Sequence, residues 1–284
     1  MGAGAAEVAR ALALLVLIGL AACATEDRPR QAPPRHTGPF EAYWPDGTLR
    51  ERGAWTRGVR DGDFESFHRN GARATEGGFE AGLPVGAHRA WNDDGRLVRE
   101  ARYAAGVEDG RITEWYDDGQ VRLTGTWAAG KRHGVETSYH PNGIVAVEGR
   151  YEHGLPVGGW TFRDEQTRVR REVLHWVEDG RRAGMLETHY DEQGRITSQS
   201  QRDREGGRWS GVDSTWHAEG QQATLVELRD GRRHGREQAW DEHGVLRLDG
   251  RWREDAKVGT WRVYGPDGVA ERTILYEDGV AVPP

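Results

Sequence analysis

Three groups of residues in this 284-residue chain have types and spacings that could carry chemistry. The first is residues 125–132, Gly-Thr-Trp-Ala-Ala-Gly-Lys-Arg, which nearly meet the spacing of a phosphate-binding loop. Such a loop needs Ser or Thr after the lysine to hold Mg²⁺, and it must open a helix. Arg132 follows Lys131 instead. These residues are therefore better explained as a turn of a repeated unit.

The second group is the histidines, of which the chain has 11. His133 and His234 stand at equivalent places just before a glycine, and His68, His140 and His217 share another place. Repetition accounts for both sets, and none forms a His-x-x-x-His pair or a Cys/His cluster of the kind that binds zinc. The sequence predicts no metal and no cofactor.

The third group is the paired carboxylates, such as Asp93-Asp94 and Asp117-Asp118. Paired carboxylates can act as general acid and base, but each of these pairs precedes a glycine. Asp is favoured there by turn geometry. No Ser/His/Asp set departs from the repeat, so we expect no catalytic residue and a protein that is not an enzyme.

These residues must be positioned by an element that recurs along the chain. A glycine opens each unit at a step of 24 residues, and after two longer steps of 26 and 27 the step returns to 24. The opening glycines are Gly38, Gly62, Gly86, Gly110, Gly134, Gly158, Gly184, Gly211, Gly235 and Gly259. A fixed period in the range of 20–50 residues marks a repeat architecture.

Each unit has the pattern of a β-hairpin. Asp-Gly or Asn-Gly between two short runs is the strongest local hairpin signal. The turn glycines are Gly47, Gly71, Gly95, Gly119, Gly143, Gly220, Gly244 and Gly268. Aromatic residues flank the turn on both sides, as in Trp91, Trp115 and Trp240 before it and Trp127 and Trp252 after it.

The length of the loop determines which side chains share a face of the hairpin, and this selects the type of turn. A three-residue loop closed by a left-handed glycine pairs Trp115 with Val121. Side chains alternate along each strand, so we expect Trp115, Val121, Gly125 and Trp127 to share one face. The fold predicted is all-β: an elongated array of about ten hairpins that form a twisted open sheet with one aromatic-lined face.

Residues 158–211 hold two irregular units. Thr167 stands where the first should have its turn glycine, and residues 198–207 of the second are polar and lack the second aromatic. A departure from the repeat can indicate function or a longer loop. We expect the longer loop, and a binding site stays the alternative.

The beginning of the chain predicts export. Residues 11–20 are apolar but too short to span a bilayer. Leu20, Ala21, Ala22 and Cys23 resemble a bacterial lipobox, in which the cysteine is lipidated and becomes the mature N-terminus. Residues 1–22 are then a lipoprotein signal peptide. An ordinary secretory peptide that ends near a cysteine is the alternative.

Residues 23–37 are the lipidated cysteine and a polar, proline-rich tether, and residues 38–284 are the repeat array. Ala24 does not signal inner-membrane retention among lipoproteins, so the resemblance implies the outer membrane or cell surface. The net charge is −7, with acidic and basic residues mixed in every unit. The sequence therefore predicts that nucleic acid is not a partner.

The unit Gly-x-x-x-x-Tyr/Trp-x-x-Asp/Asn-Gly, followed by Trp/Tyr-x-x-Gly-x-x-x-Gly, resembles the bacterial variant of the MORN repeat over residues 38–279. The resemblance implies a non-catalytic hairpin array that serves as a scaffold. Residues 190–197 also resemble one YD repeat of the toxin-shell type, but a single copy within the 24-residue series is better explained by the series.

The function expected is a membrane-anchored repeat scaffold that binds a partner protein at the bacterial cell envelope. One alternative is an antitoxin or immunity protein for a cognate toxin, because bacterial proteins with similar repeats often carry that description. Another is a module that binds a glycan or a lipid surface.

Overall fold

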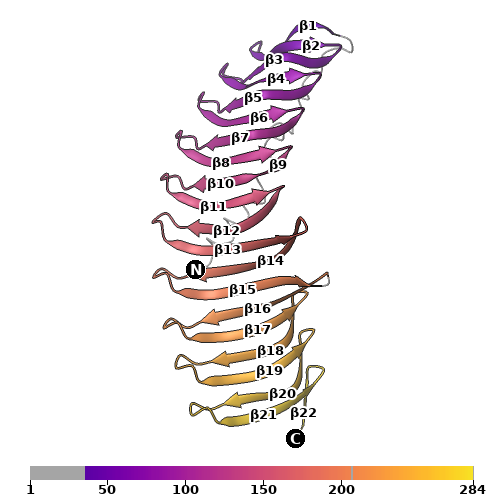
Figure 1. Ribbon diagram of the computed structural model, residues 1–284. Helices are drawn as coiled ribbons and strands as arrows, with labels where there is room; N and C mark the ends of the chain where they lie inside the picture. The colour runs from indigo at the N-terminus through magenta and orange to yellow at the C-terminus, as the bar shows by residue number, and fades with distance from the viewer. Residues whose placement is uncertain (1–35, 206, 284) are drawn as a thin grey trace.

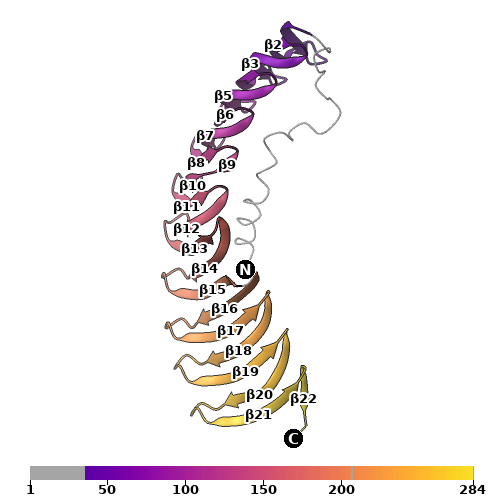
Figure 2. The same ribbon diagram turned by 45° about the vertical axis from the view of Figure 1, so that its right-hand side comes forward.

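The structure is a computed structural model that describes residues 36–205 and 207–283. Within these residues all regular secondary structure is β, in one antiparallel sheet in which each strand pairs with the next along the chain, except that β9 and β10 both pair with β8. The strands stack from β1 to β21 in a long, narrow array that curves and twists (Figures 1 and 2). The predicted all-β array of tandem hairpins is confirmed. Among the described residues, none lies in a helix long and apolar enough to cross a membrane.

The first eleven strands are β1 (Gly38–Tyr43), β2 (Leu49–Thr56), β3 (Val59–Phe67), β4 (Arg73–Glu80), β5 (Leu83–Trp91), β6 (Leu97–Ala104), β7 (Val107–Trp115), β8 (Val121–Ala128), β9 (Lys131–Arg132), β10 (Gly134–Tyr139) and β11 (Val145–Glu152). The next six are β12 (Leu155–Arg163), β13 (Val169–Glu178), β14 (Arg181–Tyr190), β15 (Ile196–Glu205), β16 (Arg208–Trp216) and β17 (Gln222–Arg229). The last five are β18 (Arg232–Trp240), β19 (Leu246–Arg253), β20 (Ala256–Tyr264), β21 (Ala270–Glu277) and β22 (Val280–Val282).

The hairpin tips are three-residue loops closed by a residue in the left-handed conformation, which is glycine at every described tip except that of β12–β13. In the β7–β8 hairpin, the Tyr116 N–H donates to the Gln120 carbonyl at 2.8 Å, and the Gly119 N–H donates to the Tyr116 carbonyl at 2.9 Å. Gly119 has φ +89°. Trp115 pairs with Val121, so the predicted loop and the predicted pair are both present.

The prediction that Trp115, Val121, Gly125 and Trp127 share one face is wrong. After the Trp115–Val121 pair the register shifts, and Glu114 pairs with Leu123. Arg122 is thus an extra residue, a β-bulge that turns the remainder of β8 over relative to the tip. Ile112 pairs with Gly125, so alternation along β7 places Trp115 and Val121 on one face and Gly125 and Trp127 on the other.

The opposite margin of the array is made of two-residue turns. Ala129 and Gly130 connect β8 to β9, with φ of +48° and +76°. Two successive residues with positive φ define the type I′ turn, whose twist matches that of the flanking strands. The same turn recurs at Ala81 and Ala105, which have φ of +47° and +46°. The array therefore alternates two turn types, one on each margin.

The opening glycines of the regular units form bulges within strands. Between β6 and β7, Ala101 pairs with Ile112 and Tyr103 pairs with Glu108, so three residues around Gly110 lie opposite one residue of β6. Gly110 has φ +119°, which only glycine adopts readily. A bulge bends its strand, and the strands are strongly curved in Figure 2.

The irregular units differ in their strands. β13, β14 and β15 have 10 residues each, and β15 pairs with β16 without any shift of register. Neither Gly184 nor Gly211 has a positive φ. The extra residues of these units are taken up by longer strands and reduced bulges, so the expectation of a longer loop is wrong. Thr167 takes the left-handed position of the missing turn glycine, with φ +70°.

Candidate functional site

The sheet has two different faces, and the first holds the thin core. We call it the aromatic face; it carries the aromatic residue after each tip and the side chain two residues after each opening glycine. The buried apolar residues of the described chain lie here, and they are Trp55, Phe64, Ala101, Ile112, Trp160, Val173, Trp252 and Trp261. Edge-to-face contacts join neighbouring rings, with centroids 4.8 Å apart for Tyr151–Trp160 and 5.2 Å for Trp252–Trp261.

Glycines make room for these rings. A Cβ built on Gly149 would lie 2.0 Å from Cδ2 of Trp160, and one on Gly250 would lie 2.1 Å from Cδ2 of Trp261. The sequence analysis did not identify the position of the ring that lies over each glycine. A bulky residue two places after the opening glycine recurs with the period, as in Phe64, Ile112 and Trp160, and that recurrence could have revealed it.

The rings of the aromatic face are covered by the protein's own cations. The guanidinium carbon of Arg60 lies 3.9 Å from the ring centroid of Phe64, and that of Arg233 lies 3.6 Å from Trp252. The Lys257 ammonium lies 4.3 Å from the Trp261 ring. Such contacts favour the folded array. They also occupy the ring faces on which a ligand would stack, so this face acts as a structural spine.

At one position in the middle of the aromatic face, a carboxylate replaces the apolar side chain. Glu136 stands where Trp160 and Ile112 stand in other units, and it is buried. Burial raises the pKa of the Glu136 carboxyl, an effect opposed by the nearby Arg132 guanidinium, whose Nε lies 3.2 Å from Oε2. Nearby, Arg99 Nη2 lies 2.5 Å from Glu108 Oε1. These groups neutralise one another and offer no free nucleophile.

We call the second face the charged face, because a row of mostly polar side chains runs along its middle. Each strand except the short β9 and β22 contributes one residue, and each residue pairs across strands with the next. From β1 to β21 the row is Glu41, Arg52, Glu65, Glu76, Arg89, Glu100, Thr113, Thr124, Thr137, Glu148, Thr161, Glu172, Thr188, Gln199, Ser214, Leu225, Gln238, Asp249, Arg262 and Thr273.

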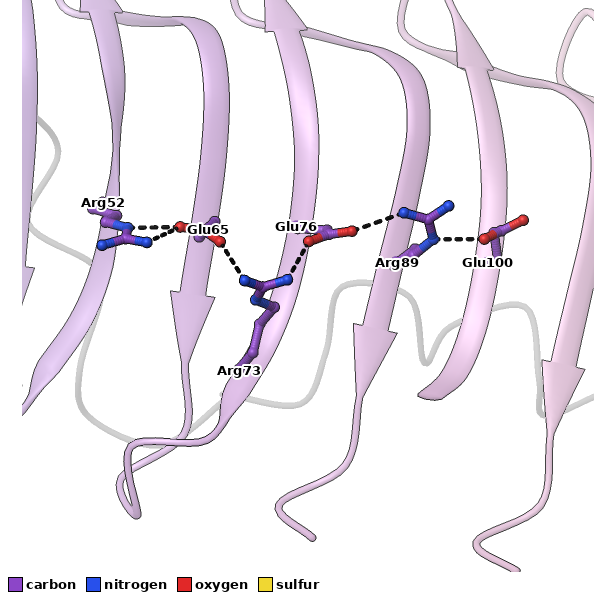
Figure 3. Close-up of polar contacts among 6 residues, drawn as sticks. All are labelled: Arg52, Glu65, Arg73, Glu76, Arg89 and Glu100. Atoms are coloured by element: carbon purple, nitrogen blue, oxygen red, sulfur yellow. Dashed lines mark hydrogen bonds and ion pairs between the residues drawn. The ribbon is translucent and has the colours of Figure 1, made fainter. Parts of the chain in front are cut away.

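The first third of this row is a ladder of ion pairs (Figure 3). Arg52 Nε donates to Glu65 Oε2 at 2.6 Å. Arg73, which lies beside the row, bridges Glu65 at 2.9 Å and Glu76 at 2.6 Å. Arg89 then joins Glu76 at 3.0 Å to Glu100 at 2.6 Å. Exposed pairs of this kind contribute little stability individually, but they hold the side chains in a fixed pattern.

The predicted site residues lie at several places. The eight turn glycines lie at the hairpin tips, with φ between +75° and +89°. Trp91, Trp115 and Trp240 lie on the charged face, while Trp127 and Trp252 lie on the aromatic face. The lipobox residues Leu20, Ala21, Ala22 and Cys23 lie outside the described residues.

The part of the chain that the structure describes contains no cluster of side chains with the composition of a metal site. No group of three or more His, Cys, Asp or Glu side chains there could hold a metal ion. His133 and His153 lie with ring centroids 5.5 Å apart, but they are only two. What the arrangement offers is a long, patterned surface.

Comparison with known proteins agrees with the repeat. Residues 132–153 match the family model of the MORN repeat variant, a range that contains the whole of β10 and β11. This repeat indicates a repeat-based binding scaffold and is typically non-catalytic. No match was found among curated proteins.

One solved structure is similar over much of the chain. It is titled "Crystal Structure of TcdB2-TccC3-TEV", and the similarity covers 85% of this chain at 8% sequence identity with a TM-score of 0.21. This chain spans 15% of the length of that one. A TM-score this low has no bearing on function.

Proposed function

We propose that the protein is a non-catalytic, exported scaffold, anchored by lipid at Cys23, that binds a partner protein at the bacterial cell envelope through its charged face. The observation that carries the proposal is the central row of that face. At about 4.8 Å per strand the row would extend roughly 90 Å. Repeat arrays use long surfaces of this kind for binding.

The chemistry of the row changes along the array although the backbone repeats. It is charged from Glu41 to Glu100, mainly threonine from Thr113 to Thr188, and mixed beyond, where the row continues as Gln199, Ser214, Leu225, Gln238, Asp249, Arg262 and Thr273. A partner can therefore bind in only one alignment along the row, because its groups meet complementary charges and hydroxyls at a single position. The aromatic face, whose rings are covered by Arg60, Arg233 and Lys257, supports the sheet from behind.

A crosslinking pull-down from intact envelopes tests the proposal. The tagged protein would be expressed with its own first 37 residues, and one dominant protein partner is expected. A matched variant with Glu65, Glu76 and Glu100 changed to Gln keeps the shape of the charged face and should lose that partner. Recovery of only lipid or glycan by the wild type would contradict the proposal and favour the surface-binding alternative.

The anchor is tested separately by Cys23→Ser. Lipidation requires the thiol, so this variant should move from the membrane fraction to the soluble fraction, whereas Cys23 in the wild type should incorporate labelled palmitate. Membrane fractionation of the variant equal to that of the wild type would contradict a lipid anchor. If the captured partner is a toxin whose activity the array blocks, the antitoxin alternative replaces the scaffold.

A further inference from the structure

On the charged face, Arg73 shows how this sheet holds a guanidinium. Its Nη2 lies 2.9 Å from Glu65 Oε1, and its Nη1 lies 2.6 Å from Glu76 Oε2 (Figure 3). Its guanidinium carbon also lies 5.4 Å from the ring centroid of Trp91 in the next hairpin. A pair of carboxylates and a nearby indole thus define a guanidinium seat.

A related seat recurs around β13 and β14, but its arginine is missing and Thr161 stands in place of Glu65, so it keeps one carboxylate of the pair. Strand register establishes the correspondence, because Arg73 pairs with the last residue of β3 as Val169 pairs with the last residue of β12. Across the next pair of strands, Glu76 pairs with Arg89 as Glu172 pairs with Thr188. The corresponding residues are Arg73 and Val169, Glu76 and Glu172, Arg89 and Thr188, and Trp91 and Tyr190.

A pocket of about 430 Å³ lies at this position, lined by Val169, Glu172, Tyr190, Glu192 and Gln193 among others. The Tyr190 hydroxyl donates to Glu172 Oε2 at 2.6 Å, which leaves Oε1 available. Within residues 36–205 and 207–283, neither Glu172 nor Glu192 forms an ion pair.

The one cation in the wall of the pocket is already engaged. Arg168 Nε lies 2.8 Å from Asp164 Oδ2, and its Nη2 donates to Gln166 Oε1 at 3.1 Å. The pocket therefore has an uncompensated negative charge beside an aromatic ring, which is the combination that binds a guanidinium.

We propose that this pocket binds an arginine side chain of the partner protein, whose guanidinium pairs with Glu172 and stacks on Tyr190. The proposal rests on the proposed function and names the chemistry that the partner must present. Arginine fits better than lysine because its planar group pairs with a carboxylate and stacks on a ring at once.

A second hairpin shows which feature sets the pocket apart. Glu100, Leu97 and Trp115 occupy the same three places between β6 and β7. There, however, the Glu100 carboxylate already accepts from Arg89 Nε at 2.6 Å. An acid without an arginine partner, next to an aromatic residue, is what distinguishes Glu172.

The test uses the tripeptide acetyl-Gly-Arg-Gly-amide as the probe, titrated into the full repeat array and followed by NMR or calorimetry. The wild type should show saturable binding, and the citrulline tripeptide, which has the same shape without the charge, should bind at least about tenfold more weakly. No saturable binding, or equal binding of the two peptides, would overturn the proposal.

Two variants locate the binding. Val169→Arg places a guanidinium in the seat, as Arg73 does, and should abolish binding with an unchanged circular dichroism spectrum. Glu172→Gln keeps the shape and should weaken binding about tenfold. Glu148→Gln, the control, changes an acid of the same row that has no such pocket and should bind as the wild type does. Undiminished binding by both pocket variants would refute the site.

The envelope pull-down separates this inference from the proposed function. If Val169→Arg and Glu172→Gln capture the partner as well as the wild type does, the array is a scaffold but the pocket is not its arginine site. If the wild type binds the arginine tripeptide but captures no protein, the pocket is supported as an arginine site and the proposed protein-binding function is contradicted.

Discussion

The indole of Trp160 lies directly on the backbone of Gly149 in the preceding strand. A Cβ on Gly149 would be 2.0 Å from Trp160 Cδ2, a distance that no real contact allows. The same relationship joins Gly250 to Trp261. In another unit the pair is Ala101 and Ile112, where a smaller side chain leaves room for a methyl group. The ring and its glycine therefore act as one packing unit.

Changing Gly149 to alanine should destabilise the array by about 1–3 kcal/mol, because the methyl group overpacks the site and displaces the indole. The urea-unfolding midpoint measures the effect. The double variant Gly149→Ala with Trp160→Ile recreates the natural Ala101–Ile112 pair and should be more stable than Gly149→Ala alone. If the second change adds a further loss, the two residues are not coupled.

The hairpin tips could be predicted from sequence because Asp118-Gly119 has strong local turn chemistry that does not depend on the remainder of the chain. The face of the sheet on which each tryptophan lies could not be predicted from sequence. The bulge at Arg122 has no marker in residue type, and one extra residue reverses every side chain beyond it. The seat of Trp160 on Gly149 and the vacant arginine place at Val169 likewise depend on which residues lie opposite each other, which only the strand register shows.

Changing Thr167 to glycine should stabilise the protein by about 1 kcal/mol. Thr167 is β-branched and has φ +70°, a conformation that strains such residues. Glycine adopts it without that strain. The matched control is Gly194→Thr in the next hairpin, where φ is +78° and a Cβ would meet nothing within 4 Å. This control should lower the free energy of unfolding by a similar amount. If both variants and the wild type unfold at the same urea concentration, backbone strain at this position does not affect stability.

His88 should make the array less stable in mild acid. Its ring lies over Gly77 between Phe79 and Tyr103, and burial lowers the pKa of His88 below the ordinary 6.5. As pH falls through 6.5 the unfolded chain binds the proton first, so stability is full above 6.5 and is lost toward the lower folded pKa.

The variant His88→Phe tests this pH dependence. It keeps the edge-to-face contacts, as Phe64 does in the preceding unit, and removes the titrating group. Urea midpoints measured from pH 7.5 to pH 5 should fall less steeply for this variant than for the wild type. His243→Gln changes a histidine whose side chain is 80% exposed and should keep the wild-type slope. A wild-type slope in His88→Phe would mean that other groups set the acid sensitivity.

Deleting residues 110–133 should shorten the array and leave it folded. The deletion joins Asp109 to Gly134, which restores an opening glycine at the same place in the strand. Each hairpin contacts only its neighbours, so the remaining units keep their partners. Circular dichroism should be unchanged per residue, and small-angle scattering should show a particle about 10 Å shorter. Deleting only residues 110–121 removes one strand and reverses the direction of all that follow, so that variant should fail to fold. Loss of structure in the exact deletion would show that the units depend on contacts beyond their neighbours.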